Sequence, residues 1–113
     1  MLKNFDESAF EETLKQPFVV LFKHSQRCGV SLLVQTRVIN KIIAENPALD
    51  IFMIDVLAQR GISDEIAERF GVHHESPQLI IIKQEEVVYH KSHWGINSTE
   101  VAQLLAEHSL MES

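Results

Sequence analysis

The sequence predicts an α/β fold in which a central, mixed four-stranded sheet is flanked by helices, with an additional helix at the N-terminus. Continuous apolar runs of β-prone residues occupy 18–22, 50–56 and 79–82, as in strands that are covered on both faces. Between the first two runs, apolar residues recur at helical spacing, and such a strand–helix–strand unit is parallel and right-handed. The third run is followed closely by another β-prone run at 87–90, which indicates an antiparallel hairpin.

Length and composition suit a single domain over residues 1–113, since 45% of the residues are hydrophobic and 23% are charged. The formal net charge is −6 and the basic residues are scattered, so we expect no nucleic-acid partner. No apolar run approaches the roughly 18 residues of a membrane span, and the start lacks the apolar core of a secretory signal. We therefore expect a cytoplasmic monomer with no membrane partner.

The first helix is expected in the stretch "NFDESAFEETLKQP", which a proline ends. Asp6 is placed to cap its N-terminus, with Phe5 and Phe10 at the positions of a hydrophobic staple. Ser8 and Glu11 form an alternative capping box, so two starting points for this helix remain open. The first buried strand follows directly at 18–22.

A long helix is expected from Gly29 to about Asn46, where Pro47 ends it. Its apolar positions recur at helical spacing; they are Val30, Leu33, Val34, Val38, Ile39, Ile42 and Ile43. The second buried strand, 50–56, comes next.

The remaining chain alternates in the same way. Ser63 is placed to cap a shorter helix that Gly71 ends. After the hairpin, Asn97 or Ser98 caps a C-terminal helix with one apolar face made by Val101, Leu104, Leu105 and His108. The order α-β-α-β-α-β-β-α is that of the thioredoxin fold.

Cys28 is the only cysteine, and in this order it lies directly after the first buried strand, at the N-terminus of the long helix. Unpaired backbone N–H groups and the helix dipole favour an anion there. Three nearby residues are expected to add positive charge and tune the thiolate, namely Lys23, His24 and Arg27. Ser31 lies one turn further on, where its hydroxyl is expected to donate to the sulfur.

This arrangement predicts a monothiol mechanism. Ser31 stands where a Cys-x-x-Cys pair would have its second thiol, so Cys28 is able to attack a disulfide but has no internal partner to resolve it. The alternative is that Cys28 is a small core residue that happens to begin a helix. The polar residues that precede it favour the reactive interpretation.

The stretches "FKHSQRC", "GVS" and "SPQLIII" resemble the YtxJ-like family of monothiol bacilliredoxins in the thioredoxin superfamily. The resemblance covers essentially the whole chain. Matching positions are Lys23, His24, Ser25, Cys28 and Ser31, followed later by Ser92, His93 and Trp94. The chain departs from the family pattern at Gly29 and Val30, where proline and isoleucine are expected.

The resemblance implies de-bacillithiolation, in which Cys28 attacks a protein–bacillithiol mixed disulfide and itself takes up the bacillithiol. The expected partners are S-thiolated cytosolic proteins and a low-molecular-weight thiol, with bacillithiol as cosubstrate and no tightly bound cofactor. The resemblance also implies a cis Ser76–Pro77 bond, with both residues lining the substrate groove. Trp94 either forms part of this thiol-binding surface or covers the core.

Two other functions fit parts of the sequence. "RCGVS" resembles the Cys-Gly-Phe-Ser site of monothiol glutaredoxins, which carry a 2Fe–2S cluster, but the glycine pair of that family is missing near Gly95. A non-catalytic binding module with the same fold is the other. The histidines, including the adjacent His73 and His74, lack the spacing of a zinc site, and no metal ligands are expected.

Overall fold

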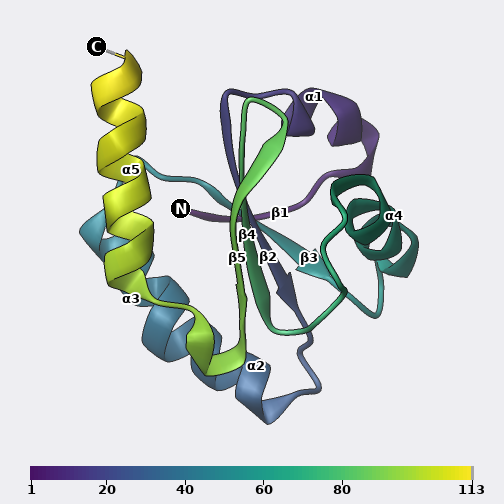
Figure 1. Cartoon of the computed structure of the whole chain (residues 1–113). Helices are drawn as coiled ribbons and strands as arrows, with labels where there is room; N and C mark the ends of the chain where they lie inside the picture. The colour runs from purple at the N-terminus through teal and green to yellow at the C-terminus, as the bar shows by residue number, and fades with distance from the viewer. Residues whose placement is uncertain (113) are drawn as a thin grey trace.

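The computed structural model describes residues 1–112, and the side chains through residue 109. Its core is a five-stranded mixed sheet in the order β1-β3-β2-β4-β5 (Figure 1). The strands β1 and β2 run parallel to β3, while β4 runs antiparallel to both β2 and β5. Their bounds are Leu2–Asn4, Phe18–His24, Ile51–Asp55, Gln78–Lys83 and Glu86–Ser92 for β1 to β5.

The strand β1 corrects the prediction of four strands. It is three residues long and takes its place through backbone pairing with the edge of β3, so no apolar run or alternation marks it in the sequence. The expected N-terminal helix follows as the 3₁₀ turn η1 (Glu7–Ala9) and the helix α1 (Phe10–Leu14). Asp6 caps it by accepting the Ser8 N–H at 2.9 Å, and the rings of Phe5 and Phe10 meet at 5.8 Å, which confirms the staple.

The long helix is confirmed, with an irregularity that was not predicted. The helices α2 (Gly29–Val34) and α3 (Asn40–Glu45) are joined without a break by the π-helical segment η2 (Gln35–Ile39). Among the apolar positions that recur at helical spacing, Val30 and Leu33 are exposed. The start of α2 projects past the end of the sheet, where there are no strands to cover it (Figure 1).

Of the two later helices, α4 (Arg60–Phe70) matches its predicted end but not its predicted start, whereas α5 (Ser98–Glu112) begins where the sequence predicts. The helix α4 begins one turn before Ser63, which lies buried inside it rather than at its cap. Gly71 ends α4 in the left-handed conformation, with φ of 63°. Asn97 caps α5 by accepting two backbone N–H groups at 2.8 and 3.1 Å.

The β4–β5 hairpin is confirmed as antiparallel. Its two connecting residues, Gln84 and Glu85, have φ of 51° and 64°. Positive φ at both positions is the pattern of a type I′ turn, which normally selects asparagine and glycine.

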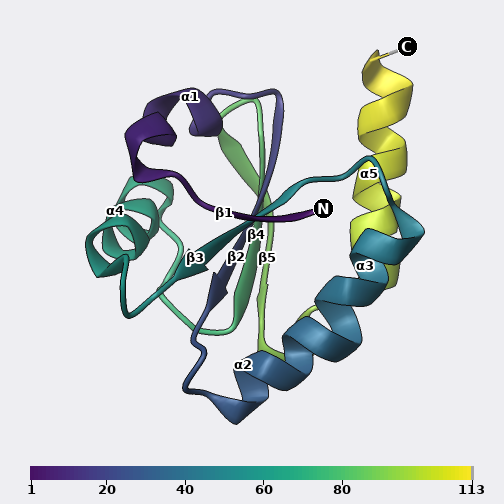
Figure 2. The same cartoon turned by 180° about the vertical axis from the view of Figure 1, so that it is seen from behind.

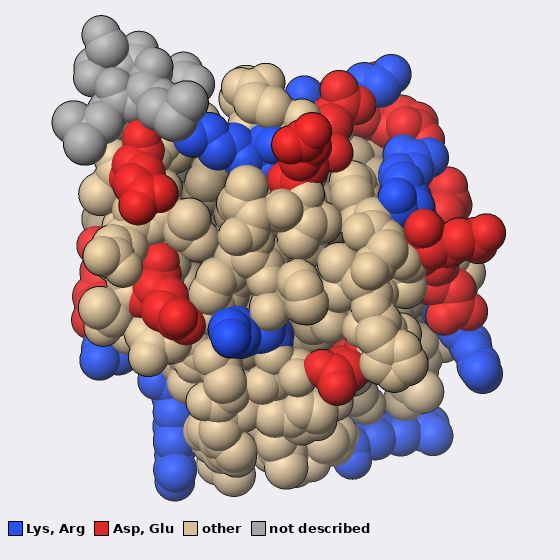
Figure 3. Space-filling view, in the orientation of Figure 1, with Lys and Arg blue, Asp and Glu red and all other residues tan. Residues whose placement is uncertain are grey.

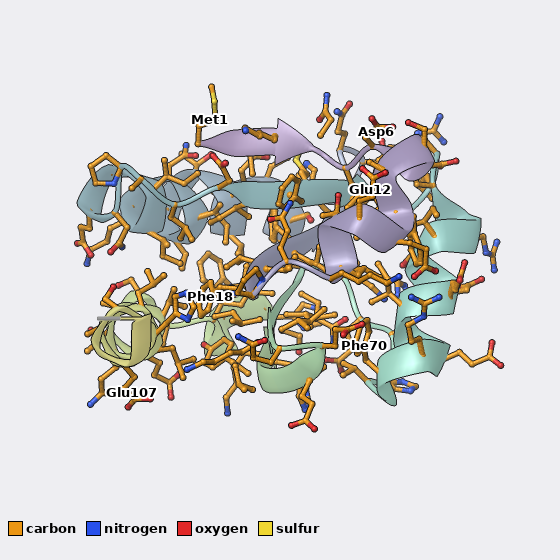
Figure 4. The ribbon with its side chains drawn as sticks, turned by 90° about the horizontal axis from the view of Figure 1, so that it is seen from above. Met1, Asp6, Glu12, Phe18, Phe70 and Glu107 are labelled. Atoms are coloured by element: carbon orange, nitrogen blue, oxygen red, sulfur yellow. The ribbon has the colours of Figure 1, made fainter. Side chains whose placement is uncertain are left out.

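The helices cover the sheet on both faces, so that two separate apolar layers form. Figures 2 and 4 show α1 and α4 on one side of the sheet, here called the α4 face. The continuous helix α2–α3 and the helix α5 lie on the other side, here called the α2 face. The buried residues of the α4 face include Phe10, Val19, Leu21, Ile54, Ile66, Ile80 and Ile82. Those of the α2 face include Val20, Phe22, Val34, Ile39, Ile42, Leu79, Ile81 and Val101.

Candidate active site

Four connections leave the sheet at the same end, the lower end in Figure 1. In the strand register, His24 at the end of β2 pairs with Asp55 at the end of β3. Lys23 pairs with Gln78 at the start of β4, and Gln78 in turn pairs with Ser92 at the end of β5. The cysteine loop, the turn after β3, the loop before β4 and the segment after β5 are therefore neighbours.

Cys28 is the N-cap residue of α2, with extended backbone angles of −103° and 118°. Its carbonyl accepts the Leu32 N–H at 3.1 Å, and its own N–H donates to the Ser25 carbonyl at 3.2 Å. The cysteine is free and partly exposed. Cys28 thus lies at a helix start and is partly exposed, and its reactive role stays a prediction.

Ser31 lies one turn inward, as expected, but its hydroxyl has different partners from the expected one. It is fully buried, and its Oγ accepts the Ser25 N–H at 3.1 Å and lies 3.0 Å from His24 Nδ1. In the residues that the structure describes, no hydrogen bond joins Ser31 to the Cys28 sulfur. The hydroxyl therefore fastens the cysteine loop to the end of β2.

His24 is buried on the α2 face, where its ring stacks on Phe22 with centroids 5.4 Å apart. Burial lowers the pKa of His24 below its ordinary 6.5, and the negative charge of Asp55 opposes this only in part. The ring is consequently neutral at pH 7. This corrects the expectation that His24 adds positive charge at the thiol.

Lys23 points to the opposite face of the sheet, because neighbouring residues of a strand alternate. Its Nζ is buried beneath α4, where it donates to the Ser63 carbonyl at 2.9 Å and lies 3.2 Å from His74 Nδ1. Burial lowers the pKa of Lys23 from 10.5 to about 8, against the opposing charge of Asp64. The expected role of Lys23 beside the thiol is therefore replaced by a place in a buried polar cluster.

Arg27 remains exposed and directly precedes the cysteine. Its side chain lines a hollow together with Gln26, Asp55, Leu57 and Ala58. Among the three cations that the sequence places near Cys28, this one keeps a solvent-facing charge on the cysteine loop.

The second predicted site element lies on the neighbouring strand. The Ser76–Pro77 peptide is cis, as the resemblance implies. Pro77 is buried, and its carbonyl accepts the His93 N–H at 2.9 Å, which ties this loop to the 3₁₀ turn η3 (His93–Gly95). His93 adopts a left-handed backbone with φ of 52°.

Trp94 lies in η3, which packs beside α2, and 53% of its surface is exposed. This exposure favours the first of the two alternatives for Trp94, a place on the surface near the thiol, over a role as a cover of the core. Figure 3 shows the lower end of the molecule with an uncharged centre and basic side chains at its margins.

Sequence reasoning missed three residues of this region. The sequence marks Asp55 only as part of a strand, although parallel pairing of the two buried strands places this residue beside the end of β2. The sequence indicates a helix cap for Ser63 and a loop for His74, and nothing in it places either residue beside Lys23. In the described part of the chain, no three histidine, cysteine or acidic side chains are grouped so that they could hold a metal.

Comparison with known proteins decides the family. The family model described as "Monothiol bacilliredoxin BrxC" matches residues 3–101. The chain belongs to the monothiol bacilliredoxin family. This confirms the resemblance noted in the sequence.

Solved structures agree with this assignment. One described as having a thioredoxin fold and a suggested oxidoreductase activity is 30% identical, with a TM-score of 0.80, over 90% of this chain and 91% of its own. Thioredoxin f2 of Chlamydomonas reinhardtii is 16% identical, with a TM-score of 0.69 over 96% of each chain. Fasciola hepatica thioredoxin is 20% identical, with a TM-score of 0.63 over 90% and 89%. The last two show the fold alone.

The bacilliredoxin chain therefore has the predicted thioredoxin fold and is a thiol oxidoreductase of that superfamily. Over residues 1–112, none of its helices has the length and apolar character that a membrane crossing needs.

Proposed function

We propose that the protein removes bacillithiol from S-bacillithiolated proteins, with Cys28 as the nucleophile. The observation that carries the proposal is the partly exposed thiol at the N-cap of α2 in a chain of this family. Backbone N–H groups of the first helical turn favour the thiolate, which is the attacking form.

The exchange step follows from a single thiol. The Cys28 thiolate attacks the bacillithiol sulfur of the mixed disulfide, a Cys28–bacillithiol disulfide forms, and the substrate protein leaves as its thiolate. Ser31 offers no sulfur for a second, internal step. A further low-molecular-weight thiol or a reductase must then attack the adduct and release the bacillithiol, so regeneration is bimolecular.

We assign the substrate groove to the surface around the cysteine loop. Ser76 and Pro77 border it on the β4 side, and the exposed ring of Trp94 offers an apolar contact next to α2. Ser31 acts there by positioning the loop that carries the thiol, through His24 and Ser25. The protein works as a monomer on thiolated proteins of the cytoplasm, where thiols stay reduced.

The test is a release assay. One test protein with a single cysteine is loaded either with bacillithiol or with glutathione, and each form is mixed with wild type or with Cys28→Ser. Intact mass spectrometry follows the freed protein thiol and the mass added at Cys28. We expect transfer of bacillithiol to Cys28, faster than that of glutathione and absent in the variant.

Two outcomes contradict the proposal at different levels. Equal transfer of both small thiols would support the exchange reaction but contradict the proposed preference for bacillithiol. No transfer from either form of the test protein would contradict the exchange reaction itself. An anaerobic preparation with visible absorbance would then favour the cluster carrier of the glutaredoxin type.

A further inference from the structure

A hollow lies directly beside the cysteine loop, between Gln26 and Arg27 on one side and the turn after β3 on the other. It measures about 360 Å³. A second hollow of about 260 Å³ adjoins it, shares Gln26, Asp55 and Ala58 with it, and reaches the buried His24. Together they have the size of a site for a small organic molecule.

The far wall of the hollow is held rigidly. Asp55 Oδ1 accepts the N–H groups of Leu57 and Ala58 at 3.0 and 3.1 Å, which closes the turn. The Asp55 N–H donates to Gln59 Oε1 at 3.1 Å, and Gln59 Nε2 donates in turn to the Phe5 carbonyl at 2.9 Å. The carboxylate is thus fixed in place before any ligand arrives, which reduces the entropy lost on binding.

The two sides of the hollow carry opposite charges that do not pair with each other. In the residues that the structure describes, neither Arg27 nor Asp55 takes part in a salt bridge, and Asp55 Oδ2 accepts no hydrogen bond. Leu57, 58% exposed, adds an apolar edge. One cation, one preorganised carboxylate and an apolar edge within one hollow match a small zwitterion with a short carbon stem.

We propose that this hollow is the subsite for the small-thiol half of the disulfide at Cys28, and that it selects a zwitterionic thiol. The ammonium group of the thiol lies toward Asp55 and its carboxylate toward Arg27. The inference rests on the proposed function, because it concerns the small thiol that Cys28 takes up. It goes beyond that function by naming the charges that the thiol must carry and the residues that bind them.

Four symmetrical disulfides of similar size separate the charges: cystine is zwitterionic, cystamine cationic, 3,3′-dithiodipropionate anionic and 2-hydroxyethyl disulfide neutral. Reduced protein is mixed with each, and the rate at which Cys28 gains the small thiol is followed by intact mass. Each rate is divided by that of free N-acetylcysteine amide with the same disulfide, which removes differences in leaving-group chemistry. Within each protein, the relative rate for each charged disulfide is then divided by the relative rate for the neutral one.

The variants are Arg27→Gln, Asp55→Asn and the double substitution. Asparagine keeps an Oδ1 acceptor for the two turn amides, so the turn persists, and circular dichroism with urea unfolding checks this. Arg37→Gln and Glu68→Gln, both at exposed positions outside the lining of the two hollows, are the matched controls.

For the wild type, we expect cystine to exceed the neutral probe by roughly tenfold, since an exposed charge pair contributes about 0.2–1 kcal/mol, or up to about fivefold, for each charge. Asp55→Asn should lose about threefold for cystine and cystamine, and Arg27→Gln about threefold for cystine and dithiodipropionate. The preference should also decrease as salt is added.

The outcomes distinguish the subsite from the function. If Cys28 reacts with all four probes at equal relative rates, or the double variant keeps the preference for cystine, the exchange function stands and the subsite is wrong. A uniform loss over all probes in Arg27→Gln, with the probe ratios intact, also overturns the subsite, because the arginine would then act on the sulfur. No reaction with any probe overturns the exchange function and the subsite together.

Discussion

Replacement of Lys23 by methionine isolates the effect of an ammonium group buried beneath α4. The side chain is fully buried, and its pKa lies at about 8 instead of 10.5. The difference corresponds to roughly 3 kcal/mol in favour of the neutral amine in the folded state. Methionine has a similar length and no charge, so the variant lacks this titration.

The sign follows from proton counting. Between pH 8 and pH 10.5 the folded protein has released the Lys23 proton while the unfolded chain still holds it, so the free energy of unfolding rises with pH. Between pH 7 and pH 9.5 this single group should add about 2 kcal/mol of stability to the wild type. The Lys23→Met variant should show no such contribution.

The assay is urea unfolding at the two pH values with a reductant present, in wild type, Lys23→Met and the exposed control Lys41→Met. Other groups titrate in all three proteins, so the quantity of interest is the difference between wild type and variant. That difference should change with pH for Lys23→Met and stay constant for Lys41→Met. If it stays constant for both, Lys23 is not a buried, weakly basic amine and the reasoning is wrong.

Three further results are expected. Ser31→Ala leaves the buried His24 ring and the Ser25 N–H without their shared partner. Urea unfolding should therefore show a decrease of about 1–3 kcal/mol in the free energy of unfolding. A decrease below about 0.5 kcal/mol would contradict the role of this hydroxyl. Gln84→Asn combined with Glu85→Gly suits the positive φ of the hairpin turn and should raise the free energy of unfolding by about 0.5–1 kcal/mol, whereas an unchanged midpoint would argue against a type I′ turn. Burial lowers the pKa of both His24 and His74 from 6.5. As pH falls below 6.5, the unfolded chain takes up these protons first, so the free energy of unfolding should decrease. An equally steep decrease in the His24→Gln, His74→Gln double variant would show that other groups cause it.

The fold was largely predictable because most of its helices and strands have a signal in their own residues. Three strands contain apolar runs and a fourth a β-prone run. Caps and stops such as Asp6, Gly71 and Asn97 work through side chains or backbone angles that belong to their own residues. The strand β1 has no such local signal, because it forms by pairing with residues of β3 that lie 49 positions away in the sequence. The start of α4 was misplaced because Gln59, a weak capping residue, precedes it.

The site was predictable in its chemistry and less so in its electrostatics. Cys28 at a helix start, the Ser76–Pro77 bond and the late His93–Trp94 segment follow from chain order and family resemblance. The charges do not, because alternation along β2 sends Lys23 and His24 to opposite faces and burial changes the protonation of both. Strand alternation could have predicted the first of these effects, whereas the second depends on which groups the other elements bring near.

The π-helical segment between α2 and α3 has a consequence for how this chain tolerates insertions and deletions. A π-helical turn is equivalent to a single residue added to an α-helix, and each added residue turns the preceding helix by about 100° about its axis. Ile39 and Ile42 anchor the far side of the segment in the core, and Ser31 anchors the near side on His24. Removal of one residue from 35–39 would regularise the helix and swing its first two turns away from that anchor. The orientation of the cysteine loop thus depends on the number of residues in a segment two helical turns away from Cys28.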